Sequence, residues 1–318
     1  MKKTNYLLSI LLLFLAACQP SENSTTTPNN TPDTGLKTKH VVVLVIDGPR
    51  FSESFGDTSR EHIPNLTQLA SEGVFYPNFL NNGVTYTNPG HTAISTGIYQ
   101  HIDNTGLEIP QYPSMFQYYL KHSGDSANQA WVIASKDKLE TLADCQQTEY
   151  AGRFNPMTDC GINGNGTGYR SDLVTIDSVK NILGKHLPKL TLINYRQPDY
   201  AGHGGNFENY LNKTEQSDSL ALVLWDFIQS TPGLANETSL FITNDHGRHL
   251  DDVADGFVSH GDDCAGCKRI SLIALGPDFV PKQVEQMREQ IDIPTTIAHM
   301  FNFDMPTAKG HVMTELFE

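Results

Sequence analysis

Long apolar runs are nearly absent from this chain of 318 residues, and basic residues are few. The one strongly apolar stretch, Tyr6 to Leu15, is shorter than the about 20 residues that a membrane-spanning helix needs. Lysine and arginine number 22 against 36 aspartates and glutamates, which gives a net charge of −14. So acidic a chain lacks the broad basic surface that nucleic-acid binding requires, and we expect no nucleic-acid polymer as a partner.

The first residues nevertheless have the pattern of an export signal. Two lysines precede the apolar stretch, and the run Leu15-Ala-Ala-Cys18 is similar to the cleavage box of bacterial lipoproteins. We therefore predict a signal peptide over residues 1–17, a lipid on Cys18 as the only membrane contact, and an exported protein of a bacterial envelope, at the outer membrane or facing the periplasm. An ordinary signal peptide or a short membrane helix is the alternative.

The amino-acid composition of the remaining residues indicates two parts, a tether and a domain. Residues 18–38 are rich in serine, threonine, asparagine and proline, which is typical of a flexible tether. Residues 39–318 are numerous enough for one large catalytic domain with a full core. Within it, the acid-rich stretch Asp251 to Asp263 is interpreted as a solvated loop rather than as a calcium site.

Cysteines are also few, with four after Cys18. Because an exported protein can oxidise its thiols, we favour disulfides that join Cys145 to Cys160 and Cys264 to Cys267. A structural metal site is the alternative for Cys264-Ala-Gly-Cys267, although the sequence shows no second pair of cysteines or histidines matched to it.

Apolar patterns predict strands that alternate with helices along the chain. Strands are predicted over Val41–Ile46, Trp131–Ala134, Leu190–Tyr195, Leu240–Thr243 and Ile270–Leu275. Helices are predicted over Pro64–Glu72, Thr92–Thr96, Asp172–Leu183, Phe207–Gln229 and Pro294–Phe301. This alternation predicts an α/β fold, a three-layer sandwich whose central, mostly parallel sheet carries helices on both faces.

Carboxylate and imidazole groups follow three of these strands, and a threonine opens a Pro-Gly turn between the first two sets. These residues are Asp47, Thr87, Asp199, His203, Asp245, His246 and His260. A single short motif of this kind is a weak signal, because it often matches by chance. Together the motifs fall at the carboxyl ends of parallel strands, where α/β proteins place their catalytic and binding residues. Oxygen and imidazole ligands suit zinc. We predict two Zn²⁺ ions, one held by Asp47, Thr87, Asp245 and His246, the other by Asp199, His203 and His260.

These motifs resemble those of the alkaline phosphatase superfamily, and specifically its nucleotide pyrophosphatase/phosphodiesterase branch. The matching stretches are Val45-Ile-Asp-Gly-Pro-Arg50, Thr87 to Gly97, Gln197 to His203, Thr243 to Gly247 and Ile291 to Asn302. The resemblance covers residues 40–307. It implies hydrolysis of a small phosphate ester, a diester or pyrophosphate rather than a monoester, through attack by Thr87 and a phospho-threonine intermediate.

Departures from the family pattern are informative. Sulfatases of the superfamily carry a Cys or Ser nucleophile followed by an Arg, whereas Thr87 and His91 stand here, which disfavours a sulfatase. Asn104 is the nearest match to the asparagine that holds a phosphoryl oxygen in the branch, at a shorter spacing. His260 follows His246 more closely than in the branch, which implies a missing insertion and a small substrate-selecting cap.

Other assignments remain open at this stage. Thr85 is the alternative to Thr87, and His249 or His311 is the alternative to His260. A transferase of the same superfamily, moving phosphoethanolamine or phosphoglycerol onto an envelope glycan, would use the same metals, but such enzymes usually carry membrane helices before the catalytic domain. A non-catalytic lipoprotein with this fold is disfavoured because every expected ligand is present.

Overall fold

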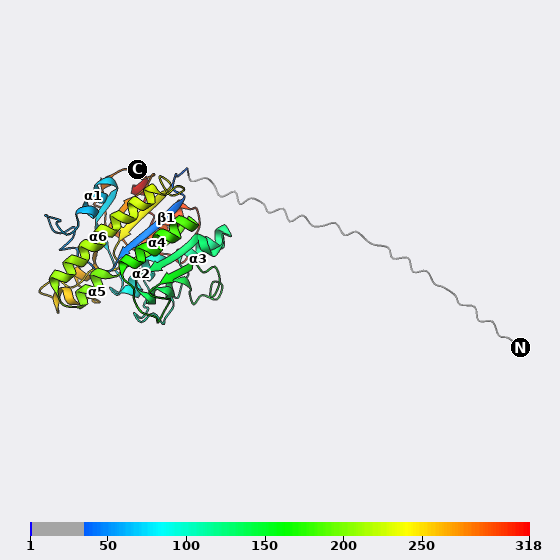
Figure 1. The fold of residues 1–318 in the computed structure, drawn as a ribbon, viewed down its shortest axis with the longest axis horizontal. Coiled ribbons are helices and arrows are strands. Elements are labelled where there is room, and N and C mark those ends of the chain that lie inside the picture. Colours follow the sequence, from blue (N-terminus) through cyan, green and yellow to red (C-terminus); the bar gives the residue numbers. More distant parts are fainter. Residues whose placement is uncertain (2–34) are drawn as a thin grey trace. The chain divides into compact units, whose positions relative to one another are not determined.

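A central sheet organises the computed structural model, which describes Met1 and residues 35–318 (Figure 1). Apart from Met1, the predicted signal peptide lies outside the described residues, as do Cys18 and the predicted tether up to residue 34. No helix within the described residues is long and apolar enough to cross a membrane.

The sheet is formed by nine strands from along the whole described domain. Its strands are β1 (His40–Ile46), β2 (Val74–Leu80), β3 (Ala130–Ala134), β4 (Met157–Cys160), β5 (Leu190–Tyr195), β6 (Thr238–Thr243), β7 (Arg269–Leu275), β8 (Lys282–Gln283) and β9 (Arg288–Glu289). Their order is β4-β3-β5-β1-β6-β7-β2-β8, and β9 pairs with β2. Strands β4, β3, β5, β1 and β6 are parallel, whereas β7 runs antiparallel to both β6 and β2. The predicted mostly parallel sheet is thus confirmed.

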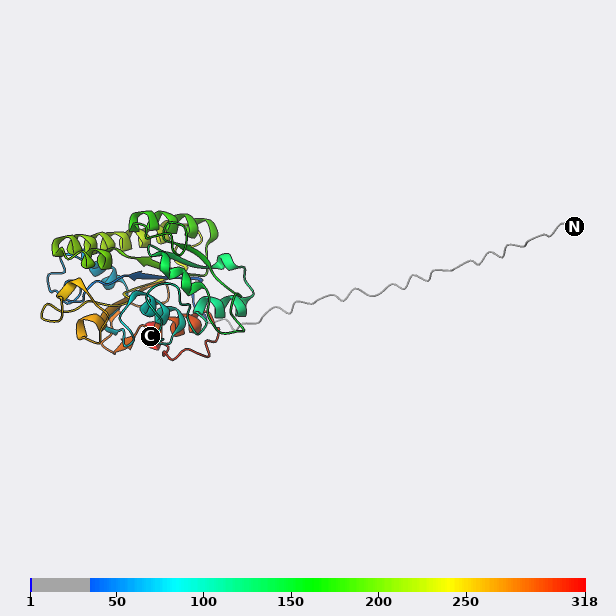
Figure 2. The same ribbon diagram turned by 90° about the horizontal axis from the view of Figure 1, so that it is seen from below.

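Helices cover both faces of the sheet, as Figure 2 shows. They are α1 (Pro64–Glu72), α2 (Thr87–Thr96), α3 (Met115–Ser123), α4 (Asp172–His186), α5 (Gln197–His203), α6 (Phe207–Ser230), α7 (Ala265–Lys268) and α8 (Asp292–Met300). Short 3₁₀ turns cover Ala127–Gln129, Asp137–Ala143, Gly256–Val258 and Thr314–Phe317. Side chains of α1, α4 and α6 pack in one core cluster, and those of α2, α3 and α8 in the other.

Strand β1 explains why two cores form. All seven of its residues are buried. Because successive side chains of a strand point to opposite faces, Val41, Val43 and Val45 enter the core under α2 and α8. Val42 and Leu44 enter the core under α4 and α6. A continuous β-branched run therefore forms a central strand covered on both faces, as the sequence predicted.

Several elements differ from the sequence prediction. Helices α3, α5 and α7 and strands β8 and β9 were not predicted, and three further differences concern β2, α2 and β4. Strand β2 was missed because Pro77 interrupts its apolar run, and the pairing with β7 shifts register between Tyr76 and Phe79, as proline in a sheet requires. Helix α2 begins at Thr87 rather than at Thr92, since proline is tolerated in the first turn of a helix. Strand β4 lies between the predicted strand Trp131–Ala134 and the predicted helix Asp172–Leu183, where no strand was predicted.

The predicted disulfides are not formed in the structure, where all four cysteines after Cys18 are free. Cys160 lies in β4 and its thiol points to the carbonyl oxygen of Val132 in the neighbouring strand, with Sγ and O 3.6 Å apart. Cys145 and Cys160 both lie in the core under α2, α3 and α8, as free thiols. Cys264 and Cys267 have a different environment, described below.

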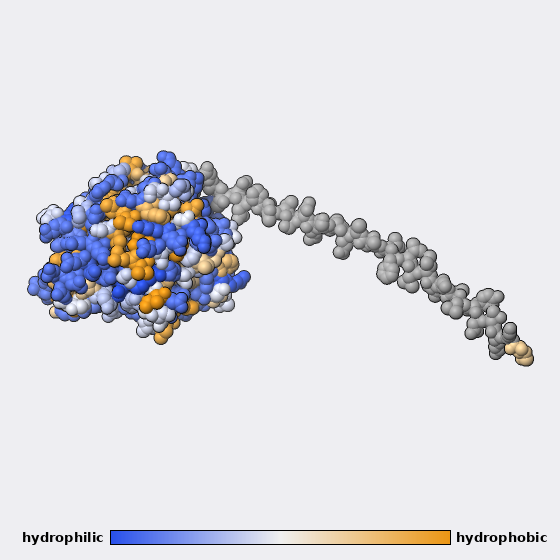
Figure 3. All heavy atoms as spheres, in the orientation of Figure 1, coloured by the Kyte–Doolittle hydropathy of each residue, from blue (hydrophilic) through white to orange (hydrophobic). Residues whose placement is uncertain are grey.

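The face shown in Figure 3 is mostly hydrophilic, with apolar side chains gathered where helices α4 and α6 lie in the same view of Figure 1. Leu173 and Val174 of α4 are about half exposed, and Val223 of α6 is also exposed. The hydrophilic part of this face agrees with the polar composition of the chain.

Candidate metal centre and nucleophile

The predicted site residues converge at the carboxyl edge of the three central strands. Asp47 directly follows β1. Asp245 follows β6 after one intervening residue, and Asp199 lies in α5, which comes after β5. Because these strands are neighbours and parallel, their carboxyl ends meet at one edge. The backbone N–H of Asp199 donates to the carbonyl oxygen of Asp47 at 3.0 Å, which ties α5 to the end of β1.

In Asp47 and Asp245, one carboxylate oxygen accepts hydrogen bonds and the other has no hydrogen-bond partner. Oδ1 of Asp245 accepts from the backbone N–H groups of Gly48 (3.2 Å) and His246 (3.0 Å). Oδ2 of Asp47 accepts from the Asn194 amide at 3.1 Å. Among the described residues, Asp47 Oδ1, Asp245 Oδ2 and His246 Nε2 are buried without a hydrogen-bond partner. Asp245 Oδ2 also lies 3.3 Å from His91 Nδ1, which is closer to the carbonyl oxygen of Thr87 at 2.9 Å. Buried polar atoms are normally satisfied, so three acceptors that face one another in this way point to a cation.

The spacing of these three atoms fits a metal ion. His246 Nε2 lies 3.5 Å from Asp47 Oδ1 and 3.4 Å from Asp245 Oδ2. A tetrahedral zinc with bonds of about 2.0–2.1 Å separates its ligand atoms by about 3.3 Å. His246 Nδ1 donates to the carbonyl oxygen of Gly247 at 2.9 Å, so the lone pair of the neutral ring is on Nε2. Burial lowers the pKa of His246 to about 3, which keeps the ring neutral.

A second group of ligand atoms surrounds Asp199. Its Oδ1 lies 3.2 Å from His203 Nε2 and 3.1 Å from His260 Nε2, and the two imidazole nitrogens are 3.2 Å apart. His260 Nδ1 donates to the carbonyl oxygen of Thr85 at 2.7 Å, so its Nε2 carries the lone pair, and its ring stacks on that of His246 at 3.8 Å. The structure therefore brings His260 to this group, whereas His311 pairs with Asp292.

This second group is less well prepared for a metal ion than the first. Arg248 Nη1 lies 2.5 Å from Asp199 Oδ1 and already partly neutralises that carboxylate. Arg248 Nη2, which can only donate, lies 3.3 Å from His203 Nδ1, a contact that favours the tautomer with the proton on Nε2. The His203 side chain is also 48% exposed. His203 would have to change its tautomer or its contact with Arg248 to bind a metal through Nε2.

Thr87 lies at the amino end of α2, beside the first group. It is 1% exposed. A Cβ at Gly90 would lie 2.6 Å from the carbonyl oxygen of Asp245, so the glycine allows α2 to approach the end of β6 closely. The first N–H groups of a helix and its dipole attract an anion, so the position suits a phosphoryl group as well as a nucleophile.

Lys136 is the residue that the sequence reasoning missed. Its Nζ lies 2.9 Å from Thr87 Oγ1, 2.9 Å from Asp47 Oδ2 and 2.6 Å from Asp199 Oδ2. It is 3% exposed. A signal existed, because Ser135-Lys136-Asp137-Lys138 directly follows a predicted strand, where the other site residues also lie.

The charges of this site are strongly coupled. Burial and the neighbouring Asp245 raise the pKa of Asp47 to about 7. Burial acts to lower the pKa of Lys136, but the carboxylates of Asp199 and Asp47 outweigh it and raise that pKa. Three carboxylates packed together thus favour additional positive charge, which Lys136 supplies in part and which divalent cations would complete.

Asn104 lies next to the start of α2. Its side-chain oxygen accepts from the backbone N–H of Asn88 at 3.0 Å and from Lys138 Nζ at 2.8 Å. These contacts orient the amide so that its NH₂ group is the end left to meet an anion. Burial and the nearby Lys136 lower the pKa of Lys138 to about 8.

A doubly covered, mostly parallel sheet with carboxylates and imidazoles at its carboxyl edge is the arrangement of metal-dependent α/β enzymes. The model of the Metalloenzyme superfamily matches residues 39–305, and the chain belongs to this superfamily, whose fold is that of alkaline phosphatase. The resemblance found in the sequence is thus confirmed.

Curated relatives are distant. The chain is 24% identical to human bis(5'-adenosyl)-triphosphatase ENPP4 over 226 residues, which are 67% of this chain and 49% of that protein. It is 26% identical to a 2,3-bisphosphoglycerate-independent phosphoglycerate mutase of Gracilaria tenuistipitata var. liui over 41% of this chain and 24% of that protein. The chain therefore spans half or less of the length of these relatives.

Solved structures show the same fold. Murine ectonucleotide pyrophosphatase/phosphodiesterase 5 in complex with AMP superposes with a TM-score of 0.61 at 15% identity, covering 88% of this chain and all of that chain. Lipoteichoic acid synthase LtaP from Listeria monocytogenes has a TM-score of 0.65 at 12% identity, covering 88% and 75%. At such identities the likeness is one of fold, and function depends on the site itself.

Proposed function

We propose that this protein is a metal-dependent hydrolase of small phosphate esters in which Thr87 is the nucleophile. The observation that carries the proposal is the position of Thr87. Its hydroxyl contacts the Lys136 ammonium at the start of α2, beside the unsatisfied ligand atoms of Asp47, Asp245 and His246. A hydroxyl, a cation and a helix amino end meet at one point, as phosphoryl transfer requires.

We assign two metal ions to the site, both Zn²⁺. Asp47, Asp245, His246 and the Thr87 hydroxyl would hold one, and Asp199, His203 and His260 the other. When bound, such ions lower the pKa of a coordinated hydroxyl and neutralise the charge of the transferred phosphoryl group. The three imidazoles in the set favour zinc over magnesium.

The chain's own groups would then act in two steps. Thr87 Oγ1 forms a bond to phosphorus as the bond to the leaving-group oxygen breaks, which gives a phospho-threonine. Lys136 stabilises the negative charge that develops on Thr87 Oγ1, and the Asn104 amide donates to a phosphoryl oxygen. The proton of the Thr87 hydroxyl passes, through solvent, to the leaving-group oxygen. Water then attacks phosphorus as the Thr87–phosphorus bond breaks, one proton of this water passes to Thr87 Oγ1, and phosphate or a phosphate monoester is released.

Relatives support a diester or pyrophosphate substrate. ENPP4 is named for hydrolysis of a dinucleoside triphosphate, and murine NPP5 was solved with AMP. The predicted lipid anchor at Cys18 would place such an activity at the surface of an envelope membrane. The diester or pyrophosphate substrate and the location at an envelope membrane are proposals for this chain.

Two lysines favour a second candidate, a phosphomonoesterase. Lys136 contacts Thr87, and Lys138 contacts Asn104, so two ammonium groups border the place of the phosphoryl group. A monoester carries one more negative charge on its phosphoryl group than a diester. Added positive charge at this position stabilises the monoester more.

Replacement of Lys138 by Ala separates the two candidates. If Lys138 holds a dianionic phosphoryl group, kcat/KM should fall about 10-fold to 100-fold more for a nitrophenyl phosphate monoester than for the diester, the range expected for one lost charge-assisted hydrogen bond. Initial rates of the zinc-loaded protein on both esters measure this. Lys185→Ala, on the exposed end of α4, is the matched control.

The same panel tests the proposed function. A loss for the diester equal to or larger than that for the monoester would remove the case for a monoesterase. Sulfate and phosphonate esters belong in the panel because superfamily folds host both activities. Turnover of sulfate esters but of no phosphate ester would contradict the proposed function.

A further inference from the structure

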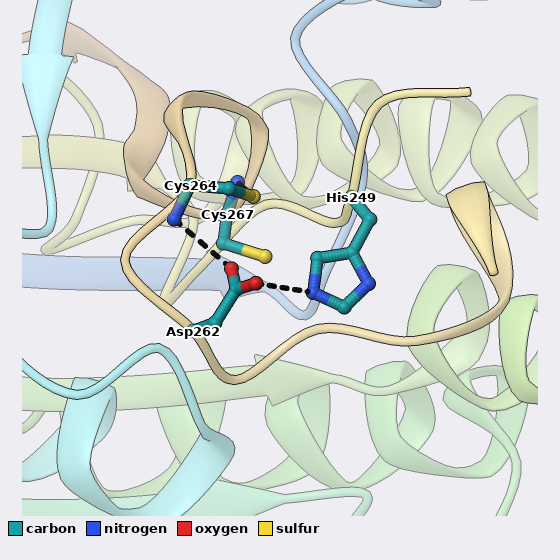
Figure 4. A group of neighbouring side chains, drawn as sticks. All are labelled: His249, Asp262, Cys264 and Cys267. Carbon is teal, nitrogen blue, oxygen red and sulfur yellow. Dashed lines mark hydrogen bonds and ion pairs between the residues drawn. The ribbon is translucent and has the colours of Figure 1, made fainter. Parts of the chain in front are cut away.

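A second cluster of ligand side chains lies outside the site described above. His249 belongs to the loop after β6, Asp262 and Cys264 to the connection between His260 and β7, and Cys267 to α7. Figure 4 shows the four side chains pointing toward one another. One nitrogen, one oxygen and two sulfur atoms of these residues all lie within 4.8 Å of one another.

His249 is the most informative member of the cluster. Its Nδ1 lies 3.3 Å from Asp255 Oδ1, which as a carboxylate oxygen can only accept, so the proton of a neutral ring is on Nδ1. The lone pair on Nε2 then faces Asp262 Oδ2 at 3.2 Å. His249 is 5% exposed, and its Nε2 has no hydrogen-bond partner within the described residues. Two acceptors at this distance repel each other unless a cation lies between them.

The other three side chains are already oriented toward that point. Oδ1 of Asp262 accepts from the backbone N–H of Cys264 at 2.9 Å, which turns Oδ2 toward His249. Cys264 Sγ accepts from the backbone N–H of Cys267 at 3.3 Å. The two sulfur atoms of the Cys-x-x-Cys sequence lie within 4.8 Å of each other. Cys267 is fully buried, and Cys264 is partly buried.

We propose that His249, Asp262, Cys264 and Cys267 bind a structural zinc ion, separate from the predicted catalytic pair. Two thiolates, an imidazole and a carboxylate form a soft, four-ligand set that suits tetrahedral zinc. Bonds of about 2.0–2.3 Å imply ligand separations of about 3.3–3.8 Å, so ligand atoms that now lie within 4.8 Å of one another would approach by at most about 1.5 Å on binding. The sequence lacked an obvious partner for the Cys-x-x-Cys pair because the partners are a single His and a single Asp from two loops.

Such an ion would connect two loops that carry active-site residues. His249 lies three residues after His246, and Asp262 lies two residues after His260. A common metal would hold the rings of His246 and His260 in their stacked arrangement, 3.8 Å apart. This positioning effect rests on the proposed function, whereas the binding of zinc by the cluster does not.

Cobalt substitution of the full-length protein tests the proposal without any variant. Co²⁺ bound by thiolates gives a sulfur-to-metal charge-transfer band, and neither set of the catalytic site contains a sulfur ligand. We expect this band in the Co²⁺-loaded wild type. We also expect Cys264 and Cys267 to resist alkylation until the metal is chelated. A Cys264–Cys267 disulfide detected by mass spectrometry, or no charge-transfer band, would overturn the proposal.

Variants assign the site to these residues. Cys264→Ser/Cys267→Ser should lose the band and about one zinc ion per chain by elemental analysis, and His249→Ala should weaken the band. Cys145→Ala, a buried cysteine outside the cluster, is the control that should keep both. An unchanged zinc content in the double variant would contradict the site, with an ion pair between protonated His249 and Asp262 as the remaining explanation of their contact.

The same set separates this site from the catalytic one. Asp245→Ala should remove activity and keep the cobalt–thiolate band, so failure of the proposed function would leave this site intact. If zinc positions His260, the double cysteine variant should lose about 10-fold to 100-fold in kcat, the range for residues that orient a metal ligand. A full rate in that variant would reject the positioning role.

Discussion

Thr87→Ala should abolish turnover of phosphate esters while the fold and most of the bound zinc survive. The hydroxyl supplies the attacking oxygen at the start of α2, and the nearby Thr85 hydroxyl donates instead to the carbonyl oxygen of Asp262. We expect kcat to fall about 1,000-fold or more, which corresponds to about 4 kcal/mol in the activation barrier. Steady-state rates on nitrophenyl esters measure the loss, and circular dichroism and zinc content show whether the protein remains intact.

Thr96→Ala is the matched control for this substitution. Thr96 lies in the same helix and is also buried, but its hydroxyl donates to the carbonyl oxygen of Thr92 at 2.7 Å, within α2. Its removal should leave the rate within a few-fold of wild type. A near-normal rate in Thr87→Ala would exclude Thr87 as the nucleophile. Thr85, whose hydroxyl donates to the carbonyl oxygen of Asp262 at 2.8 Å, would then be examined next.

Removal of metal should have an effect of similar size. Asp47, Asp245 and His246 each present one unsatisfied buried atom to the same point, so loss of a cation leaves two carboxylate oxygens and a nitrogen lone pair facing one another. We expect exhaustive chelation to lower activity about 1,000-fold or more. We also expect Zn²⁺ to restore more of it than Mg²⁺, because imidazole ligands favour the softer ion.

Two variants reloaded with zinc after chelation show which site the activity depends on. In Cys264→Ser/Cys267→Ser, zinc bound at the catalytic site should restore the activity that this variant had before chelation, because its catalytic ligands are intact. Asp245→Ala should not recover at any zinc concentration that leaves the protein soluble. Full activity after chelation, with absence of metal verified by elemental analysis, would contradict a metal-dependent mechanism.

The framework of the fold could be predicted from the sequence because it depends on local patterns. Continuous apolar runs such as Val41–Ile46 and Leu190–Tyr195 are typical of strands covered on both faces, and the structure has β1 and β5 there. The residues that directly follow such strands lie at one edge of a parallel sheet. From this rule the sequence analysis predicted that Asp47, Asp199 and Asp245 lie close together, as they do in the structure.

What could not be predicted depends on contacts between distant loops. Lys136 reaches Asp47, 89 positions earlier in the chain. Its place after a predicted strand indicates the edge of the sheet, but not that its ammonium group is buried between two carboxylates. The partners of Cys264 and Cys267 became visible only when the loop with His249 was placed beside them. Strand β2 was missed for a local reason, because Pro77 is a strong signal against a strand and only the shifted pairing with β7 accommodates it.

The most direct test of the central claim is to trap the phosphoryl group on the protein. The zinc-loaded enzyme is mixed with an excess of a nitrophenyl phosphate ester and quenched in acid within one turnover, and its peptides are analysed by mass spectrometry. The mechanism predicts a phosphoryl or substituted phosphoryl group on Thr87, and none in Thr87→Ala. A catalytically competent modification at another residue would contradict the assignment of Thr87. Turnover in Thr87→Ala at the wild-type rate would do the same.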